Sequence, residues 1–392
     1  MVTNMATTRE RDVETETETE TTFHPARITP QTFQTLLDRY STTARNVQRR
    51  KAMLKQQPKD SKKRKTSSPP LTKTNFDPAE ERSIQDEVEK YLDLDRMRYE
   101  TLPGTVWRRE DEEGQGQGPR FTKEELVRIM EWKTKHGRPR PALLGMIRSN
   151  PEKLALKCTS AAMAALPVAH STTEDEDEDD DFPKQSMDDL SPLRGVGPAT
   201  ASLILSIATT GESDRVQVPF FSDDTYLWLC VGEYPESTAS SETVRVIRGG
   251  SGGSGKGPGS KFVKPNGELS LKYNVAEYRE LWKACVELRE RFAGAGAGDT
   301  VSMVDIEKVA YVLRNIAVSG FYADIDVQEV LHMTVEQADA LSARLAGRED
   351  VKGECEGGDG ALSQEENKSE SEDKDKGKDE RASRKSKRAK KA

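Results

Sequence analysis

The stretch from Leu193 to Leu205 limits most strongly what this chain can fold into. It reads Leu-Arg-Gly-Val-Gly-Pro-Ala-Thr-Ala-Ser-Leu-Ile-Leu. Two glycines one residue apart allow a tight reversal of the backbone, and Pro198 suits the first position of a helix. The apolar residues that follow have helical spacing. We therefore predict two helices joined by a short hairpin, over residues 188–207.

The start of the second predicted helix is a candidate anion site. The first amides of a helix have no partner within it, and they lie at the positive end of its dipole. A DNA phosphate is one anion that such a site can hold. The candidate DNA-binding residues are Gly195, Val196, Gly197, Ala199 and Thr200. Two other interpretations stay open, because the hairpin can also serve only to pack two helices or to bind a protein.

A second stretch follows the hairpin after a longer loop, Pro-Phe-Phe-Ser-Asp-Asp-Thr-Tyr at 219–226. With Leu-x-Gly-Val-Gly-Pro-x-Thr-Ala, it resembles the helix–hairpin–helix DNA glycosylases related to endonuclease III and alkyladenine glycosylase. The resemblance covers roughly residues 121–317. The chain is also similar to a group of uncharacterised eukaryotic, largely fungal proteins. They share Trp-Lys…His-Gly-x-x-Arg-Pro (here 132–141), Gly-Val-Gly-Pro-Ala-Thr-Ala-Ser (195–202) and Pro-Phe-Phe-Ser-Asp (219–223). The resemblance implies an all-α, glycosylase-like helical domain.

The resemblance also implies chemistry for one carboxylate. Asp224 falls where the glycosylases place an aspartate that stabilises positive charge on the sugar or activates a nucleophile. Tyr226 stands where they have a histidine. Bifunctional members carry a lysine inside the hairpin, and the matching position here is Ala199, so no lyase reaction is expected. The alternative for Asp224 is that it only caps a helix, and Asp223 competes with it for either role.

Three hypotheses for the function follow. The first is a nuclear protein that binds duplex DNA through phosphate contacts, without sequence preference. The second is an active monofunctional DNA glycosylase that uses Asp224, and the third is a non-enzymatic scaffold that binds other proteins. Whether the chain is an enzyme stays open. No metal or cofactor is expected, because the cysteines lack the spacing of a zinc or iron–sulfur site; they are Cys158, Cys230, Cys285 and Cys355.

Composition sets the domain organisation. The chain has 392 residues, of which 33% are charged and only 34% hydrophobic. One core of modest size with long disordered arms fits this balance. We predict a disordered basic arm over 1–76, a helical pre-domain and linker over 77–120, a helical domain over 121–346 and a disordered charged tail over 347–392. Disordered insertions are expected near 171–183 and 236–262.

Charge is distributed in blocks, so the net charge of −8 says little about partners. Lys62–Lys65 and Arg381–Lys391 are dense basic runs that suit nuclear import and non-specific DNA affinity. Within the domain, basic side chains crowd one predicted helix end and can meet phosphates: Lys133, Lys135, His136, Arg138 and Arg140. No signal peptide or membrane-length apolar run is present, so no membrane partner is expected. Four aromatic residues are expected in the core rather than in a base pocket: Trp132, Tyr226, Trp228 and Trp282.

Overall fold

The chain is helical throughout the part that the computed structural model describes. The described residues are 23–57, 75–108, 118–137, 140–169, 181–212, 214–232, 270–294, 301–333 and 335–346. Among them, extended backbone pairs only at one bridge, between Val168 and Arg215. The prediction of an all-α fold is confirmed for these residues. The predicted C-terminal tail and most of both predicted insertions lie outside them.

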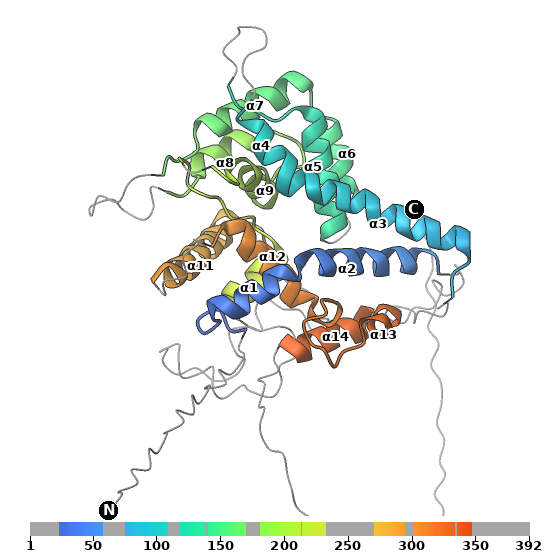
Figure 1. The fold of residues 1–392 in the computed structure, drawn as a ribbon. Helices are drawn as coiled ribbons and strands as arrows, with labels where there is room; N and C mark the ends of the chain where they lie inside the picture. The colour runs from blue at the N-terminus through green and yellow to red at the C-terminus, as the bar shows by residue number, and fades with distance from the viewer. Residues whose placement is uncertain are drawn as a thin grey trace, which may run out of the picture. The chain divides into compact units, whose positions relative to one another are not determined.

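Figure 1 shows the helices in their order along the chain. The first three are α1 (Pro30–Asp38), α2 (Tyr40–Lys55) and α3 (Pro78–Arg96), and α3 continues through the π-helical turn η2 (Met97–Thr101) into α4 (Leu102–Val106). The middle of the chain forms α5 (Lys123–His136), α6 (Pro141–Arg148), α7 (Glu152–Ala164), α8 (Lys184–Leu190), α9 (Pro198–Thr209), α10 (Asp223–Tyr226) and η3 (Leu227–Val231). The last group is α11 (Val275–Gly294), α12 (Met303–Arg314), η6 (Ile316–Val318), α13 (Val327–His332) and α14 (Val335–Ala346).

Several helix starts are fixed by local sequence. A capping box starts α5: the Glu125 amide donates to Thr122 Oγ1 at 3.3 Å, and the Thr122 amide donates to Glu125 Oε2 at 2.8 Å. The same reciprocal pair joins Ser302 and Asp305 at α12. Each pair satisfies two amides that the helix itself leaves without a partner. These starts were predictable from four residues each.

The predicted disordered arm over 1–76 is wrong for residues 23–57. α1 and α2 place buried side chains in the main core, and the Phe33 ring lies 5.2 Å from that of Phe292. The pre-domain is not separate either, since Tyr91 of α3 belongs to the same core. The helical spacing was visible in the sequence. Its partner surface comes from residues more than 250 positions later, which a local pattern does not reveal.

A buried polar network joins the N-terminal helices to α5 and α12. Asp95 Oδ1 accepts hydrogen bonds from Tyr40 Oη at 3.0 Å, Tyr91 Oη at 3.1 Å and Trp132 Nε1 at 2.8 Å. Arg98 Nη2 donates to Glu307 Oε2 at 2.5 Å, and both of these side chains are buried. The network therefore ties α2, α3, η2, α5 and α12 to one another.

Replacing Phe33 tests whether α1 is part of the core. Phe33→Ala removes a ring that is 2% exposed and packs against Phe292 and Trp228. We expect a loss of about 3–5 kcal/mol in the free energy of unfolding, because the cavity adds to the lost transfer energy. Denaturant unfolding of the full chain measures it. Gln34→Ala, at an exposed position of the same helix, should change stability by less than about 0.5 kcal/mol. Equal stability of the two variants would contradict the core assignment.

Candidate functional site

The turn at residues 191–197 connects α8 and α9 where the sequence predicts a hairpin between two helices. Gly195 has a φ of 86°, and a Cβ there would come within 3.2 Å of Met146 Cβ on α6. Asn150 clamps the neighbouring residue: Arg194 N donates to Asn150 Oδ1 at 2.9 Å, and Asn150 Nδ2 donates to Arg194 O at 3.0 Å. The fold itself thus requires a glycine at 195.

Gly197 differs from Gly195. It is the exposed N-cap residue of α9, with φ −109° and ψ −175°, a conformation open to any residue. A Cβ at Gly197 would meet nothing within 4 Å. Serine, threonine, asparagine and aspartate are the favoured N-cap residues, yet no side chain caps α9. Internal packing therefore does not explain this glycine.

The five candidate DNA-binding residues differ in whether their backbone amides have a hydrogen-bond acceptor within the protein. Val196 is buried and its amide donates to Leu193 O, whereas the Thr200 amide donates to Gly197 O at 2.8 Å. Within the described ranges, no acceptor pairs with the amides of Gly195, Gly197 and Ala199. These three amides can therefore serve an external acceptor, and the other two cannot.

Lys133 reaches the start of α9 from the last turn of α5. Its Nζ donates to Ala199 O at 2.6 Å and to Thr200 Oγ1 at 2.9 Å. The side chain is half-buried, the amine is withdrawn from solvent, and Nζ lies 5.5 Å from the centre of the Phe220 ring. α5 thus brings a lysine amine to the Ala199 carbonyl, although the turn itself contains no lysine. Lys133 stood in the predicted basic cluster, but the sequence did not identify its partner.

The charge of Lys133 is held in an unfavourable setting. Burial, with a smaller contribution from Arg140, lowers the pKa of its amine to about 7 against the opposing effect of Asp223. No carboxylate in the described part of the chain lies within ion-pair distance of the amine. A buried cation without a counter-anion is destabilising. A strongly shifted group of this kind is also a marker of functional sites.

Asp223 accepts a hydrogen bond from a tyrosine whose backbone conformation is uncommon. Tyr273 Oη donates to Asp223 Oδ1 at 2.8 Å, and Arg140 Nη2 donates to Tyr273 Oη at 3.1 Å. Tyr273 has a φ of 53°, the only positive value at a non-glycine position among the described residues. Burial and Asp223 raise the pKa of Tyr273 to about 12. Such strain is more common at functional sites than elsewhere.

Three segments that are far apart in the chain, 132–141, 195–202 and 219–223, meet around Lys133. Lys133 lies on the first, its acceptors Ala199 and Thr200 lie on the second, and Phe220 and Asp223 lie on the third. More than 80 residues separate the ends of these stretches in the chain. Their convergence makes this the candidate site.

Asp224 is not the helix cap that the alternative interpretation expected. Ser222 is the N-cap of α10, and its Oγ accepts from the Thr225 amide at 3.0 Å. Asp224 lies in the first turn, half-buried, where it acts on two other groups. It raises the pKa of Lys51, which burial has lowered to about 8, and it adds to the rise that burial causes in the pKa of Tyr311.

His136 of the predicted basic cluster and the four aromatic residues expected in the core all lie in the interior. His136 is stacked between Trp132 at 4.4 Å and Tyr311 at 4.1 Å, and its Nδ1 lies 2.7 Å from Tyr91 Oη. Burial, with Lys51 and Arg98 adding to it, lowers the pKa of His136 well below its usual value. His136 is therefore neutral at pH 7 and does not meet phosphates. The four aromatic residues expected in the core are buried there: Trp132, Tyr226, Trp228 and Trp282.

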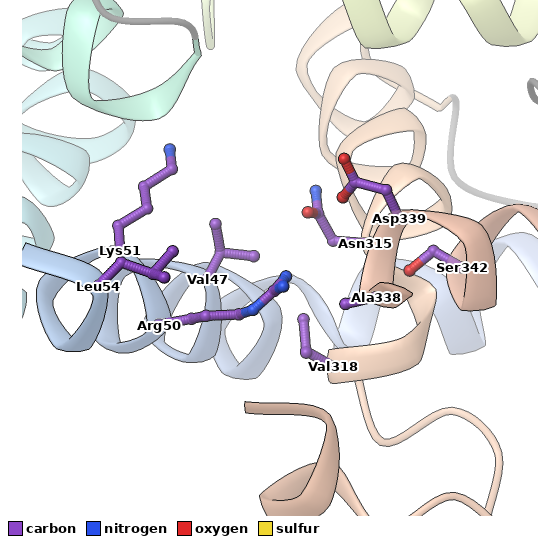
Figure 2. A pocket seen from close by; sticks show the side chains of 9 residues that line it. All are labelled: Val47, Arg50, Lys51, Leu54, Asn315, Val318, Ala338, Asp339 and Ser342. Carbon is purple, nitrogen blue, oxygen red and sulfur yellow. The ribbon is translucent and has the colours of Figure 1, made fainter. Parts of the chain in front are cut away.

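A hollow of about 120 Å³ lies between α2, α12, η6 and α14 (Figure 2). Figure 2 shows Arg50 reaching from α2 toward Val318 and Ala338, whereas the Lys51 amine points away from them. That amine donates to the carbonyls of Lys135 and His136 at the end of α5. Its lining combines four aliphatic side chains with five polar or charged ones: Arg50, Lys51, Asn315, Asp339 and Ser342. We assign no chemistry to this hollow.

Compared with known proteins, the chain matches no family model, no curated protein and no solved structure. Over the ranges that the structure describes, no helix combines the length and apolar content needed to cross a membrane. The geometry of the site therefore carries the functional argument by itself.

The buried charge of Lys133 makes stability depend on pH. Its pKa is about 7 in the folded chain and about 10.4 unfolded, so the unfolded chain binds more protons between these values and stability rises with pH there. Lys133→Met removes this effect. We expect the variant to gain more stability over the wild type at pH 6 than at pH 9, by denaturant unfolding. Lys153→Met, at an exposed position of α7, is the control and should show no such difference. An equal effect of Lys133→Met at both pH values would contradict the burial of the charge.

Proposed function

We propose that this protein binds the phosphate backbone of duplex DNA through the 191–197 turn and the first turn of α9. The contact is made in the nucleus, without sequence preference and without lyase chemistry. The main support is Gly197: it is exposed, no side chain caps the helix there, and a Cβ at this position would meet nothing within 4 Å. The amides of Gly195, Gly197 and Ala199 have no acceptor in the described chain. A glycine there lets another backbone approach closely.

Charge near the turn supports an anionic partner. Arg194 is exposed within the turn, Arg140 lies before α6, and Lys133 stands behind the start of α9. The dipole of α9 adds positive potential at the same end. Amide contacts to phosphate fix position and carry no sequence information, which is why sequence preference is not expected.

Two substitutions at Gly197 separate charge from capping. Asparagine and aspartate cap a helix about equally well, so both variants should keep or raise stability. Only Gly197→Asp adds a negative charge where the phosphate would lie. We expect duplex affinity to fall at least about tenfold in Gly197→Asp relative to Gly197→Asn, by fluorescence anisotropy of a labelled duplex. Wild-type affinity should also fall steeply as salt rises.

Two results would contradict phosphate binding by the turn. If the full chain shows no salt-sensitive binding to duplex DNA, or if the two Gly197 variants bind equally, the turn does not hold a phosphate. Packing of α8 against α9 or binding of a protein would then be its role. Gly195→Ala is unsuitable as a test, because both its backbone angle and Met146 oppose a side chain.

A second candidate function, base removal by Asp224, rests on one observation. Ser222 caps α10, so the carboxylate of Asp224 is not needed as the cap. Its negative charge acts instead toward Lys51 and Tyr311. A fixed carboxylate of this kind can stabilise positive charge on a sugar as a base leaves.

Asp224→Asn tests this candidate on a panel of duplexes with damaged bases. If Asp224 is catalytic, the variant should lose base release while keeping its fold and DNA affinity, because Ser222 still caps α10. Asp93→Asn, the same change at an exposed position of α3, is the control. Release that survives in Asp224→Asn would exclude Asp224 as the catalytic carboxylate. No release by the wild type would exclude base removal and leave the binding function in place.

A further inference from the structure

We infer that Lys133 is the cation of the phosphate site, and that a phosphate bound at the 191–197 turn retains the proton of its amine. DNA binding would then take up one proton at this lysine as pH rises above neutrality. The inference rests on the proposed function, since it names a further residue of the same site and its dependence on pH.

The amine of Lys133 contacts the first turn of α9, which also carries the amides that have no acceptor. Lys133 Nζ donates to Ala199 O, and the amide of the same residue has no acceptor in the described ranges. Gly197, two residues earlier, is exposed and open. An anion bound at the amides of Gly197 and Ala199 would share this turn with the ammonium, and opposite charges attract each other strongly where water is excluded.

The acceptors of the Lys133 amine are both neutral. They are a carbonyl and a hydroxyl, whereas Arg98, the other buried cation near Phe220, has the carboxylate of Glu307. The acid whose charge acts on the Lys133 amine is Asp223, and it accepts a hydrogen bond from Tyr273. A cation and a helix start, both positive and both without an anion, thus adjoin each other.

The direction of the effect follows from linkage. Burial and Arg140 hold the pKa of the free amine at about 7. A nearby phosphate favours the charged amine and raises that pKa. Below pH 7 the amine is already charged, so affinity changes little. Above pH 7 binding must draw a proton from solvent, and affinity falls by up to about tenfold per pH unit until the pKa of the bound state is passed.

Other groups that face the amine do not explain such a change. Arg140 stays charged throughout this range, and the pKa of Tyr273 is about 12. The remaining neighbours of the amine are the carboxylate of Asp223 and two side chains that have no titratable group, Thr200 and Phe220. Lys51 titrates with a pKa of about 8, but its amine is bound to carbonyls at the end of α5 rather than to α9. Lys51 is therefore the matched control.

The test measures affinity of the full chain for a labelled duplex from pH 6 to pH 9 at constant ionic strength. We expect the wild type to bind evenly below pH 7 and progressively more weakly above it. Lys133→Met should bind weakly at all pH values, Lys133→Arg should keep its acid-side affinity to pH 9, and Lys51→Met should keep the wild-type slope.

Calorimetry gives an independent readout. Titration at pH 8 in two buffers of different ionisation enthalpy should show uptake of close to one proton by the wild type and none by Lys133→Met. Salt-sensitive binding with the same pH slope in Lys133→Met, or with no proton uptake by the wild type, would overturn the role of Lys133 alone. No salt-sensitive binding at any pH would overturn the proposed function and this inference together.

Discussion

The interior of this fold depends on the pairing of charges that are removed from water. Arg98 and Glu307 are both buried and bonded to each other, and the Asp95 carboxylate is satisfied by two hydroxyls and an indole. Removing one partner of such a pair leaves an uncompensated charge, which costs about 3–5 kcal/mol. The network therefore allows only an arrangement in which α2, η2, α5 and α12 meet, and the apolar contacts pack around it.

The network also sets the position of the candidate site. Trp132 donates to Asp95 and stacks on His136, so the last turn of α5 is fixed on one side. Lys133 is the next residue, roughly 100° further around the helix, and its amine reaches α9 and the Phe220 ring. A one-residue rotation of α5 would break the indole bond and withdraw the amine from Ala199. Interior and site are thus coupled through two consecutive side chains.

Structural features that depend on a few neighbouring residues could be predicted from the sequence. Capping boxes at Thr122 and Ser302, the turn around Gly195 and the buried aromatic residues were all predictable, since each depends on a few neighbouring residues. The core role of α1 was not predictable, because its partner helices lie far along the chain. The sequence likewise does not distinguish a buried pair such as Arg98 and Glu307 from solvated surface charges. Lys133 appeared only as one of several basic residues.

Two buried cations near the Phe220 ring differ in whether the described chain supplies a carboxylate partner. Arg98 and Lys133 lie 6.0 and 5.5 Å from the centre of the Phe220 ring. Both lose hydration there, but only Arg98 has a carboxylate partner in the described chain. Arg98 lies deep in the core, where a counter-ion has to come from the chain itself. Lys133 lies behind an exposed turn with unpaired amides, where an anion from outside can supply the missing charge. The asymmetry between these two cations is the physical reason for proposing an anion-binding site at the start of α9.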